Sequence, residues 1–260
     1  MTDAAVELIE SPWNVAGEVF AAVSCRGKLA RSNSLRQPGF EGLNLAQHVG
    51  DTTARVDANR EKLAAQFPGP LEWHWLEQVH GVEIADLDSS AGPPKVADAA
   101  ISSTPKRVCG ILTADCLPIF FYSRTEKRVA VAHAGWRGLA GGVVEATLGE
   151  FAGPASQIRV WLGPAIGPCH FEVGGEVREI FLESGTSALS KESIARAFVA
   201  SETQGKFQAD LYALASQRLV SAGVREIEGG GLCTFCDPER FYSYRRDPVC
   251  GRMLSMIYIK

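Results

Sequence analysis

The sequence predicts an α/β or α+β fold, in which helices and strands form layers around a mixed sheet within one domain spanning residues 1–260. Short strand-like runs separated by Gly, Pro, Asp and Ser fill the centre of the chain, while helical patterns gather in its second half. Strands and helices do not alternate strictly, which argues against a purely parallel sheet. With 46% hydrophobic residues, the chain can bury a sizeable core.

The first elements are a predicted strand over residues 17–24 and a polar, glycine-containing loop over 26–42. Loops of that length in a compact domain are often functional. A helix is predicted over residues 51–67, with Asp51 as its N-cap. Residues 1–15 are expected to form an N-terminal extension.

The remaining elements follow from local periodicity and from turn residues. Six strands are predicted in the centre of the chain, over residues 71–78, 82–87, 98–102, 108–114, 118–123 and 128–134. Helices are predicted over residues 141–151, 174–184, 190–199 and 210–222. Further strands are predicted over residues 158–163, 225–231, 241–246 and 253–259.

Charge and cysteine content narrow the function classes. Lys and Arg total 26 against 30 Asp and Glu, for a net charge of −4, and no long run of like charges occurs. This balance argues against a nucleic-acid or membrane partner. The acidic N-terminus lacks a signal-peptide pattern and no long apolar span occurs, so a cytoplasmic protein is expected. Seven cysteines, an odd number, favour reduced thiols over a disulfide framework.

Three strand-like runs are interrupted by a potential metal ligand, at His80, Cys116 and His133. Side chains at neighbouring strand ends can converge, and two imidazoles with a thiolate would form a three-ligand zinc site with an open fourth position. Spacing alone leaves other interpretations open, because a free cysteine is ordinarily a buried apolar residue and a lone histidine an ordinary polar one. A cysteine hydrolase or amidase, with Cys116 as nucleophile and His133 as base, is the alternative enzyme class.

Several nearby residues admit a functional and a structural interpretation. Arg137 lies four residues after His133. It could bind phosphate with its planar guanidinium, or simply pair with a surface carboxylate. Cys233 and Cys236 form a single C-x-x-C, a weak metal or redox signal, and are expected to be buried thiols that support the C-terminal strands. Cys169 and His170 would point to opposite faces if they lie in a strand.

Six stretches of the sequence carry a resemblance to a known family: NLAQHVGD (44–51), QVHG (78–81), TADCLPI (113–119), HAGWRGL (133–139), AIGPCHFEVG (165–174) and CTFCDPERFYSYRRD (233–247). Together they resemble the YfiH-like family, also called the laccase-domain or multicopper polyphenol oxidase family. The resemblance implies a four-layer α-β-β-α fold and a zinc ion held by His80, Cys116 and His133, with copper as the alternative metal. Two stretches depart from the family pattern, AAVSCRG (21–27) and YRRDPVCGR (244–252).

The family resemblance also implies an activity. It indicates a purine nucleoside phosphorylase that uses phosphate to split adenosine, inosine, guanosine and methylthioadenosine, with an additional adenosine deaminase activity. Asn44, His48 and Cys169 are implied as substrate-binding residues. Polyphenol oxidation is disfavoured, because a trinuclear copper centre with its separate electron-transfer copper needs on the order of ten histidines and the chain has five. Neither the residues nor the resemblance indicates an oligomeric state.

Overall fold

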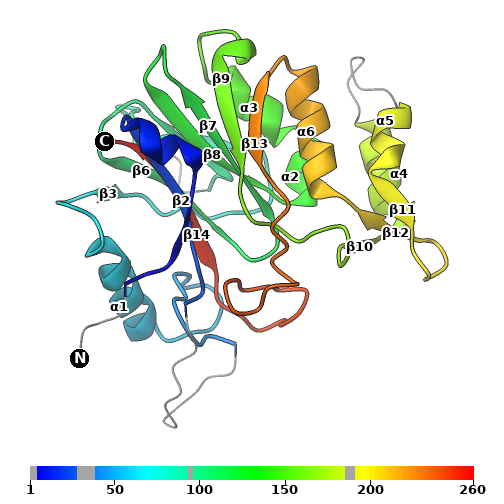
Figure 1. Ribbon diagram of the computed structural model, residues 1–260, viewed down its shortest axis with the longest axis horizontal. Helices are drawn as coiled ribbons and strands as arrows, with labels where there is room; N and C mark the ends of the chain where they lie inside the picture. Colours follow the sequence, from blue (N-terminus) through cyan, green and yellow to red (C-terminus); the bar gives the residue numbers. More distant parts are fainter. Residues whose placement is uncertain (1–4, 28–38, 93–95, 185–190) are drawn as a thin grey trace.

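The computed structural model describes residues 5–27, 39–92, 96–184 and 191–260. It forms one mixed α/β domain in which two sheets lie face to face and helices cover both outer faces (Figure 1). The predicted fold class and the four-layer α-β-β-α order are therefore confirmed. Within the described ranges, every helix is too short or too polar to span a bilayer.

The first sheet has five strands in the order β1-β2-β14-β6-β3. Its members are β1 (Leu8–Glu10), β2 (Val19–Ser24), β14 (Met253–Ile259), β6 (Arg107–Thr113) and β3 (Glu72–Trp73). The C-terminal strand β14 pairs antiparallel with both β2 and β6, so the last residues of the chain are central to this sheet. Strand β1, from the predicted N-terminal extension, forms its edge.

The second sheet has six strands in the order β13-β9-β7-β8-β5-β4. Its members are β13 (Glu226–Gly229), β9 (Ile158–Leu162), β7 (Leu117–Ser123), β8 (Arg128–Ala134), β5 (Ala99–Ser102) and β4 (Ile84–Asp86). Strands β7 and β8 form an antiparallel hairpin whose register places Pro118 opposite His133. The residue before β7, Cys116, is thereby brought next to the end of β8.

Three hydrophobic clusters hold the layers together. Residues of both sheets, such as Ile111 and Phe120, fill the space between the sheets. The outer face of the six-stranded sheet packs on α2 (Trp136–Gly141), α3 (Val143–Gly149), α4 (Gly175–Glu183) and α6 (Leu211–Ser221). The outer face of the five-stranded sheet packs on α1 (Thr53–Ala64). Each helix thus covers the apolar face that its sheet leaves open.

A small third sheet and short helices complete the chain. Strands β10 (Glu172–Gly174), β12 (Lys206–Ala209) and β11 (Phe198–Ala200) form an antiparallel sheet in that order. The third sheet adjoins α4 and α5 (Lys191–Arg196) at one end of the molecule (Figure 1). Two single-turn 3-10 helices, η1 (Pro12–Ala16) and η2 (Ala155–Gln157), precede β2 and β9 respectively.

The structure corrects four element predictions. Helix α1 begins at Thr53 with Thr52 as N-cap, because the Asp51 carboxylate instead accepts a hydrogen bond from the Thr52 amide. The helix predicted over 141–151 is two helices, interrupted at Gly142, whose φ of 99° ends the first one. Residues 241–246 form turns rather than a strand, and the helix predicted over 190–199 gives way to β11. Most of the predicted loop over 26–42 lies outside the described residues.

Candidate active site

The structure brings together the three ligand candidates predicted from the sequence. Donor atoms of His80, Cys116 and His133 all lie within 4.8 Å of one another. Their positions come from different elements, because His133 lies near the end of β8, Cys116 directly precedes β7, and His80 lies in the connection between β3 and β4. The Cys116 sulfur is 3.8 Å from His80 Nε2, and the two imidazole rings meet edge to face at 4.7 Å between centroids.

The His80 loop is fastened to both sheets. Gln78 donates its side-chain amide to the Leu112 carbonyl (2.9 Å) and accepts from the Leu112 amide (2.7 Å), so it extends the edge of β6 as a strand would. Two residues later the chain turns at His80 itself, whose φ is 62°. A positive φ is uncommon outside glycine and persists only where the surrounding contacts enforce it.

Those contacts come from Asp98, a fully buried carboxylate directly before β5. One oxygen accepts from the His80 amide (2.9 Å) and from His133 Nδ1 (2.8 Å), and the other accepts from the amides of Val79 (3.1 Å) and Gly81 (2.7 Å). One carboxylate therefore fixes both the backbone that carries His80 and the ring of His133. Because His133 Nδ1 donates to Asp98, its other nitrogen, Nε2, is left as the ligand atom.

Two of the positions that follow His133 require glycine, because a side chain there would clash with the His80 loop or with Cys116. A Cβ on Gly135 would lie 2.8 Å from His80 Cδ2 and 3.0 Å from the Cys116 sulfur, which is closer than real side chains pack. A Cβ on Gly138 would lie 2.8 Å from the Gly81 carbonyl oxygen. Gly135 therefore leaves room for the His80 and Cys116 side chains, and Gly138 lets its helix lie against the backbone of the His80 loop.

Without a metal ion, the charges in the cluster favour a thiolate at Cys116 beside a protonated His133. Burial alone would raise the pKa of Cys116, but the adjacent His133 and His80 lower it to about 6. Burial alone would lower the pKa of His133, but Cys116 and Asp98 raise it to about 9. Burial likewise opposes ionisation of Asp98, yet the hydrogen bonds from His133 and the backbone amides lower its pKa.

A cavity of about 580 Å³ opens onto the three ligand candidates. Its apolar and aromatic wall is formed by Leu112, Trp136, Ile166, Phe171 and Tyr244. Arginine side chains supply most of the charge around it, from Arg137, Arg245 and Arg252. A pocket lined by aromatic rings and arginines suits a flat, partly apolar ligand that carries or meets an anion.

Arg137 has the least restricted guanidinium of the three. Arg245 donates to the carbonyls of His170 and Glu172, and Arg252 donates to those of Cys250 and Gly251. Arg137 is exposed, lies 4.4 Å above the Trp136 ring, and forms no ion pair with any carboxylate of the described residues. The interpretation of Arg137 as half of a surface ion pair is therefore wrong for the described part of the chain.

The structure separates the three residues that the family resemblance implied as substrate contacts. His48 lines the cavity, and its pKa is lowered by burial and then by the charges of Arg252 and Arg60. Asn44 is fully buried and outside the cavity lining, and its side-chain oxygen accepts from the amides of Ala46 and Arg252. Cys169 is also outside the cavity lining and belongs to a second cluster of cysteine and histidine.

Sequence reasoning missed two contributors to the site, Asp98 and Thr113. Asp98 could have been noticed as a charged residue at the start of an otherwise apolar predicted strand, because a buried carboxylate requires partners. Thr113 is buried against the cavity, and its hydroxyl has no hydrogen-bond partner among the described residues. Thr113 opens the TADCLPI stretch (113–119), and that motif is the signal that could have drawn attention to it.

The donor set fits a zinc ion with one position left for a ligand. Two histidine nitrogens and one cysteine sulfur converge, and a buried carboxylate orients one of the histidines. The five histidines of the chain do not gather as a multinuclear copper centre requires. His48 lines the same cavity as His80 and His133. His74 instead pairs with Glu72, and His170 lies in the second cluster. A single copper ion remains compatible with the same donors.

Comparison with known proteins finds relatives that match nearly the whole chain. The chain is 45% identical over 250 residues to a purine nucleoside phosphorylase of Pseudomonas aeruginosa, an alignment that covers 95% of this chain and 96% of the relative. It is 46% identical over 229 residues to purine nucleoside phosphorylase YfiH of Escherichia coli, covering 88% and 91%.

Solved structures with the same fold also match nearly the whole chain. A Neisseria meningitidis protein superposes with a TM-score of 0.85 at 37% identity, covering 97% of this chain and 99% of that one. YlmD from Geobacillus stearothermophilus superposes with a TM-score of 0.82 at 29% identity, covering 100% and 98%. Residues 26–260 match the family described as multi-copper polyphenol oxidoreductase laccase, and the chain belongs to that family.

Proposed function

We propose that this protein is a zinc-dependent purine nucleoside phosphorylase that acts on adenosine, inosine, guanosine and methylthioadenosine. The observation that carries the proposal is the guanidinium of Arg137, which lines the cavity that holds His80, Cys116 and His133 and has no carboxylate partner among the described residues. An anion such as phosphate would be held there beside the metal ligands. The names of the relatives from Pseudomonas aeruginosa and Escherichia coli support the same activity.

Phosphorolysis requires phosphate to attack C1′ of the ribose while the purine leaves with the electrons of the glycosidic bond. Arg137 would bind the phosphate oxygens through its planar fork of N–H donors, which suits tetrahedral oxyanions. Arg252 and His48, on the same cavity wall, add positive charge and a further donor. The attacking anion would therefore be oriented before the bond breaks, which accounts for much of the rate gain in such reactions.

The purine would lie on the aromatic wall of the cavity. Trp136, Phe171 and Tyr244 present ring faces or edges there, and Tyr244 is 55% exposed and so open to a ligand. A zinc ion bound by the three ligands would supply a Lewis acid that polarises an oxygen of substrate or phosphate.

Adenosine deamination belongs to the proposal as a secondary activity. It would need a proton carrier close to the purine, and Asp115 is the nearest carboxylate on the cavity lining. Both of its oxygens are already engaged, one by the Thr234 hydroxyl (2.6 Å) and the other by the Arg245 amide (2.7 Å). We therefore expect phosphorolysis to be the faster reaction of the two.

A cysteine-dependent hydrolase is the second candidate, and one specific arrangement favours it. Cys116, His133 and Asp98 have the order of a nucleophile, a base and a group that orients the base. In that case a bound metal would block the nucleophile and inhibit the enzyme. The two candidates consequently predict opposite responses to metal removal.

The experiment that tests the proposal measures release of adenine from adenosine with and without inorganic phosphate. The proposal expects adenine and ribose 1-phosphate only in the presence of phosphate, with activity lost on chelation and restored by zinc. Arg137→Ala should raise the KM for phosphate by about tenfold to hundredfold, the loss expected for a charged hydrogen-bonded pair, and Arg137→Lys should recover part of it.

The matched control is Arg55→Ala, because Arg55 lies on α1 outside the cavity lining and pairs with Asp51. An unchanged KM for phosphate in Arg137→Ala would remove Arg137 from the anion site. Activity that needs no phosphate and rises after chelation would replace the phosphorylase with the cysteine hydrolase.

A further inference from the structure

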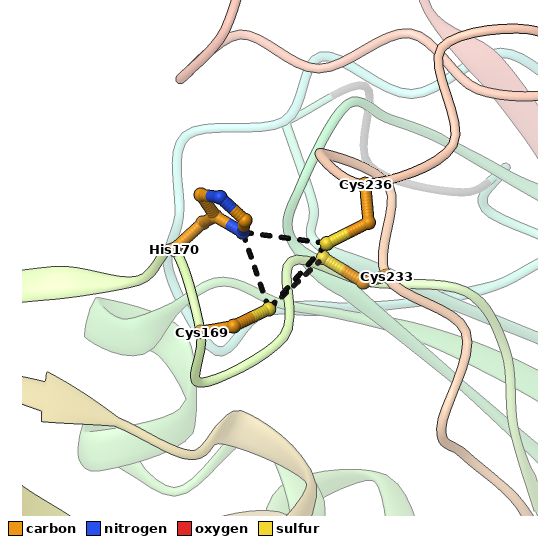
Figure 2. Close-up of side chains that lie close together, drawn as sticks. All are labelled: Cys169, His170, Cys233 and Cys236. Carbon is orange, nitrogen blue, oxygen red and sulfur yellow. Dashed lines mark hydrogen bonds between the residues drawn. The ribbon is translucent and has the colours of Figure 1, made fainter.

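A second cluster of metal-binding side chains lies outside the candidate active site. Cys169, His170, Cys233 and Cys236 bring three sulfurs and one ring nitrogen within 4.8 Å of one another (Figure 2). The pairs come from two segments far apart in sequence, the turn before β10 and the segment between β13 and β14. The prediction that Cys233 and Cys236 are buried is wrong, because Cys236 is exposed and Cys233 is half-buried. Residues 168–170 form a turn, so the strand alternation that would separate Cys169 from His170 does not apply.

Four of the six distances between the donor atoms are close to the edges of a tetrahedron around zinc. With Zn–S near 2.3 Å and Zn–N near 2.0 Å, tetrahedral ligands lie about 3.8 Å apart for two sulfurs and about 3.5 Å apart for sulfur and nitrogen. Here Cys169 Sγ is 3.8 Å from Cys233 Sγ and 3.5 Å from Cys236 Sγ. His170 Nδ1 is 3.2 Å from Cys169 Sγ and 3.3 Å from Cys236 Sγ.

The surroundings of the cluster are arranged for thiolate ligands. The Gly167 amide donates to Cys233 Sγ at 3.2 Å, and a Cβ on Gly167 would lie 3.3 Å from the same sulfur. Phe235 also stacks on the His170 ring at 3.9 Å, which fixes the orientation of that ligand.

Arginines next to the cluster hold the loop and offset its charge. Arg246 donates to the carbonyls of Thr234 and Phe235 (3.0 and 2.9 Å), which lie between the two cysteines of the C-x-x-C segment. Arg245 donates to the His170 carbonyl at 3.1 Å. Three thiolates and one divalent cation would leave one negative charge, and two guanidinium groups lie beside it.

We propose that Cys169, His170, Cys233 and Cys236 form a second, structural zinc site with a closed Cys3His ligand set. Four protein ligands leave no position for water or substrate, which is the property of structural rather than catalytic zinc. Its effect is to join the turn at 167–171 to the segment at 233–236. Both border the cavity, because Phe171 lines it and Thr234 holds Asp115.

Zinc analysis of variants that empty the two clusters separately tests this proposal. Purified Cys116→Ala protein, which lacks a ligand of the first cluster, should retain one zinc ion per chain. The same protein with Cys233→Ser and Cys236→Ser should fall to background zinc content. Cys25→Ala is the matched control, because Cys25 is a buried thiol outside both clusters, and its zinc content should equal that of the unmodified chain.

The two metal sites remain distinguishable in this design. Zinc that disappears in Cys116→Ala but persists in Cys233→Ser/Cys236→Ser would overturn the second site while leaving the proposed phosphorylase intact. Replacing zinc with Co²⁺ in Cys116→Ala should give the intense absorption of sulfur-to-cobalt charge transfer with tetrahedral ligand-field bands. Absence of those bands after Co²⁺ titration would also overturn the proposal.

A measurement on the unmodified chain avoids variants that fail to fold. Zinc should protect Cys169, Cys233 and Cys236 from a maleimide reagent, and removal of zinc with a chelator should expose all three to labelling, mapped by mass spectrometry. A disulfide within the cluster would leave two of these thiols unlabelled until a reductant is added. That outcome, or labelling that zinc does not slow, would contradict the proposal.

Discussion

Replacing Asp98 with asparagine tests whether one carboxylate holds both the His80 loop and the His133 ring. The aspartate accepts four hydrogen bonds, from three backbone amides and from His133 Nδ1. Asparagine has nearly the same shape but only one acceptor oxygen. Whichever way the amide is oriented, its NH2 group points at two of the four hydrogen-bond donors, and these two lose their acceptor.

The expected cost can be worked from those contacts. Leaving a buried donor unsatisfied costs about 1–3 kcal/mol, so two of them predict a loss of about 2–6 kcal/mol in the free energy of unfolding. For a protein of this size that loss lowers the melting temperature by roughly 10 °C. Changing a residue that orients a metal ligand also weakens metal binding by about tenfold to hundredfold.

The assay combines urea unfolding with zinc competition against a chelating dye, in protein that carries Cys233→Ser so that the second cluster does not contribute. Asp88→Asn is the matched control. Asp88 accepts from Ser102, Ser103, Thr104 and Arg107 at the opposite end of β5, so its replacement should lower stability without changing zinc affinity. If Asp98→Asn keeps the zinc affinity of the parent protein, the inference that Asp98 orients the ligands is refuted.

Three further predictions follow from the structure. Gly135→Ala should reduce zinc affinity and activity, because the added Cβ would press on His80, although the φ of −64° at this position suits alanine. Gly149→Ala is the control, since a Cβ there meets nothing within 4 Å. Equal zinc affinity in the two variants would contradict the packing argument. Phe121→Ala should cost about 3–5 kcal/mol in urea unfolding, because Phe121 is fully buried between the six-stranded sheet and its helices. Hydrogen bonds from Lys206 and two hydroxyls lower the pKa of Glu172 to about 2, so Glu172→Gln should lower the melting temperature at neutral pH. Because the folded pKa lies below the ordinary value of 4.5, that difference should vanish as the pH falls through 4.5 toward 2, and a pH-independent difference would refute it.

The three candidate metal ligands could be named from the sequence, but the contacts that bring them together could not. His80, Cys116 and His133 each interrupt a strand-like run, and the family motifs single out the same residues. Asp98 orients His133 and the His80 loop from a position that carries no motif of its own. Its role exists only because β5 lies between β4 and β8, so that one carboxylate reaches two separate segments.

The second cluster shows the same limit of sequence-based prediction more clearly. Neither Cys169-His170 nor Cys233-x-x-Cys236 is a complete metal motif, so neither pair predicts a metal site in isolation. The isolated bridge between Ala165 and Cys233 brings the two segments together. The turn at 168–170 then places Cys169 and His170 on the same side, contrary to the alternation expected of a strand.

Local pattern determined the strands and most helices of this protein, because apolar periodicity and turn residues act over a few neighbouring positions. Strands β5 to β9, β13 and β14 and helices α4 and α6 lie where the sequence predicts them. Only the tertiary structure decided that residues 241–246 turn instead of extending, since Arg246 holds the carbonyls of Thr234, Phe235 and Phe241 there. Both metal-binding clusters likewise depend on contacts between distant segments, and such contacts are fixed by packing of the whole domain rather than by any local run of residues.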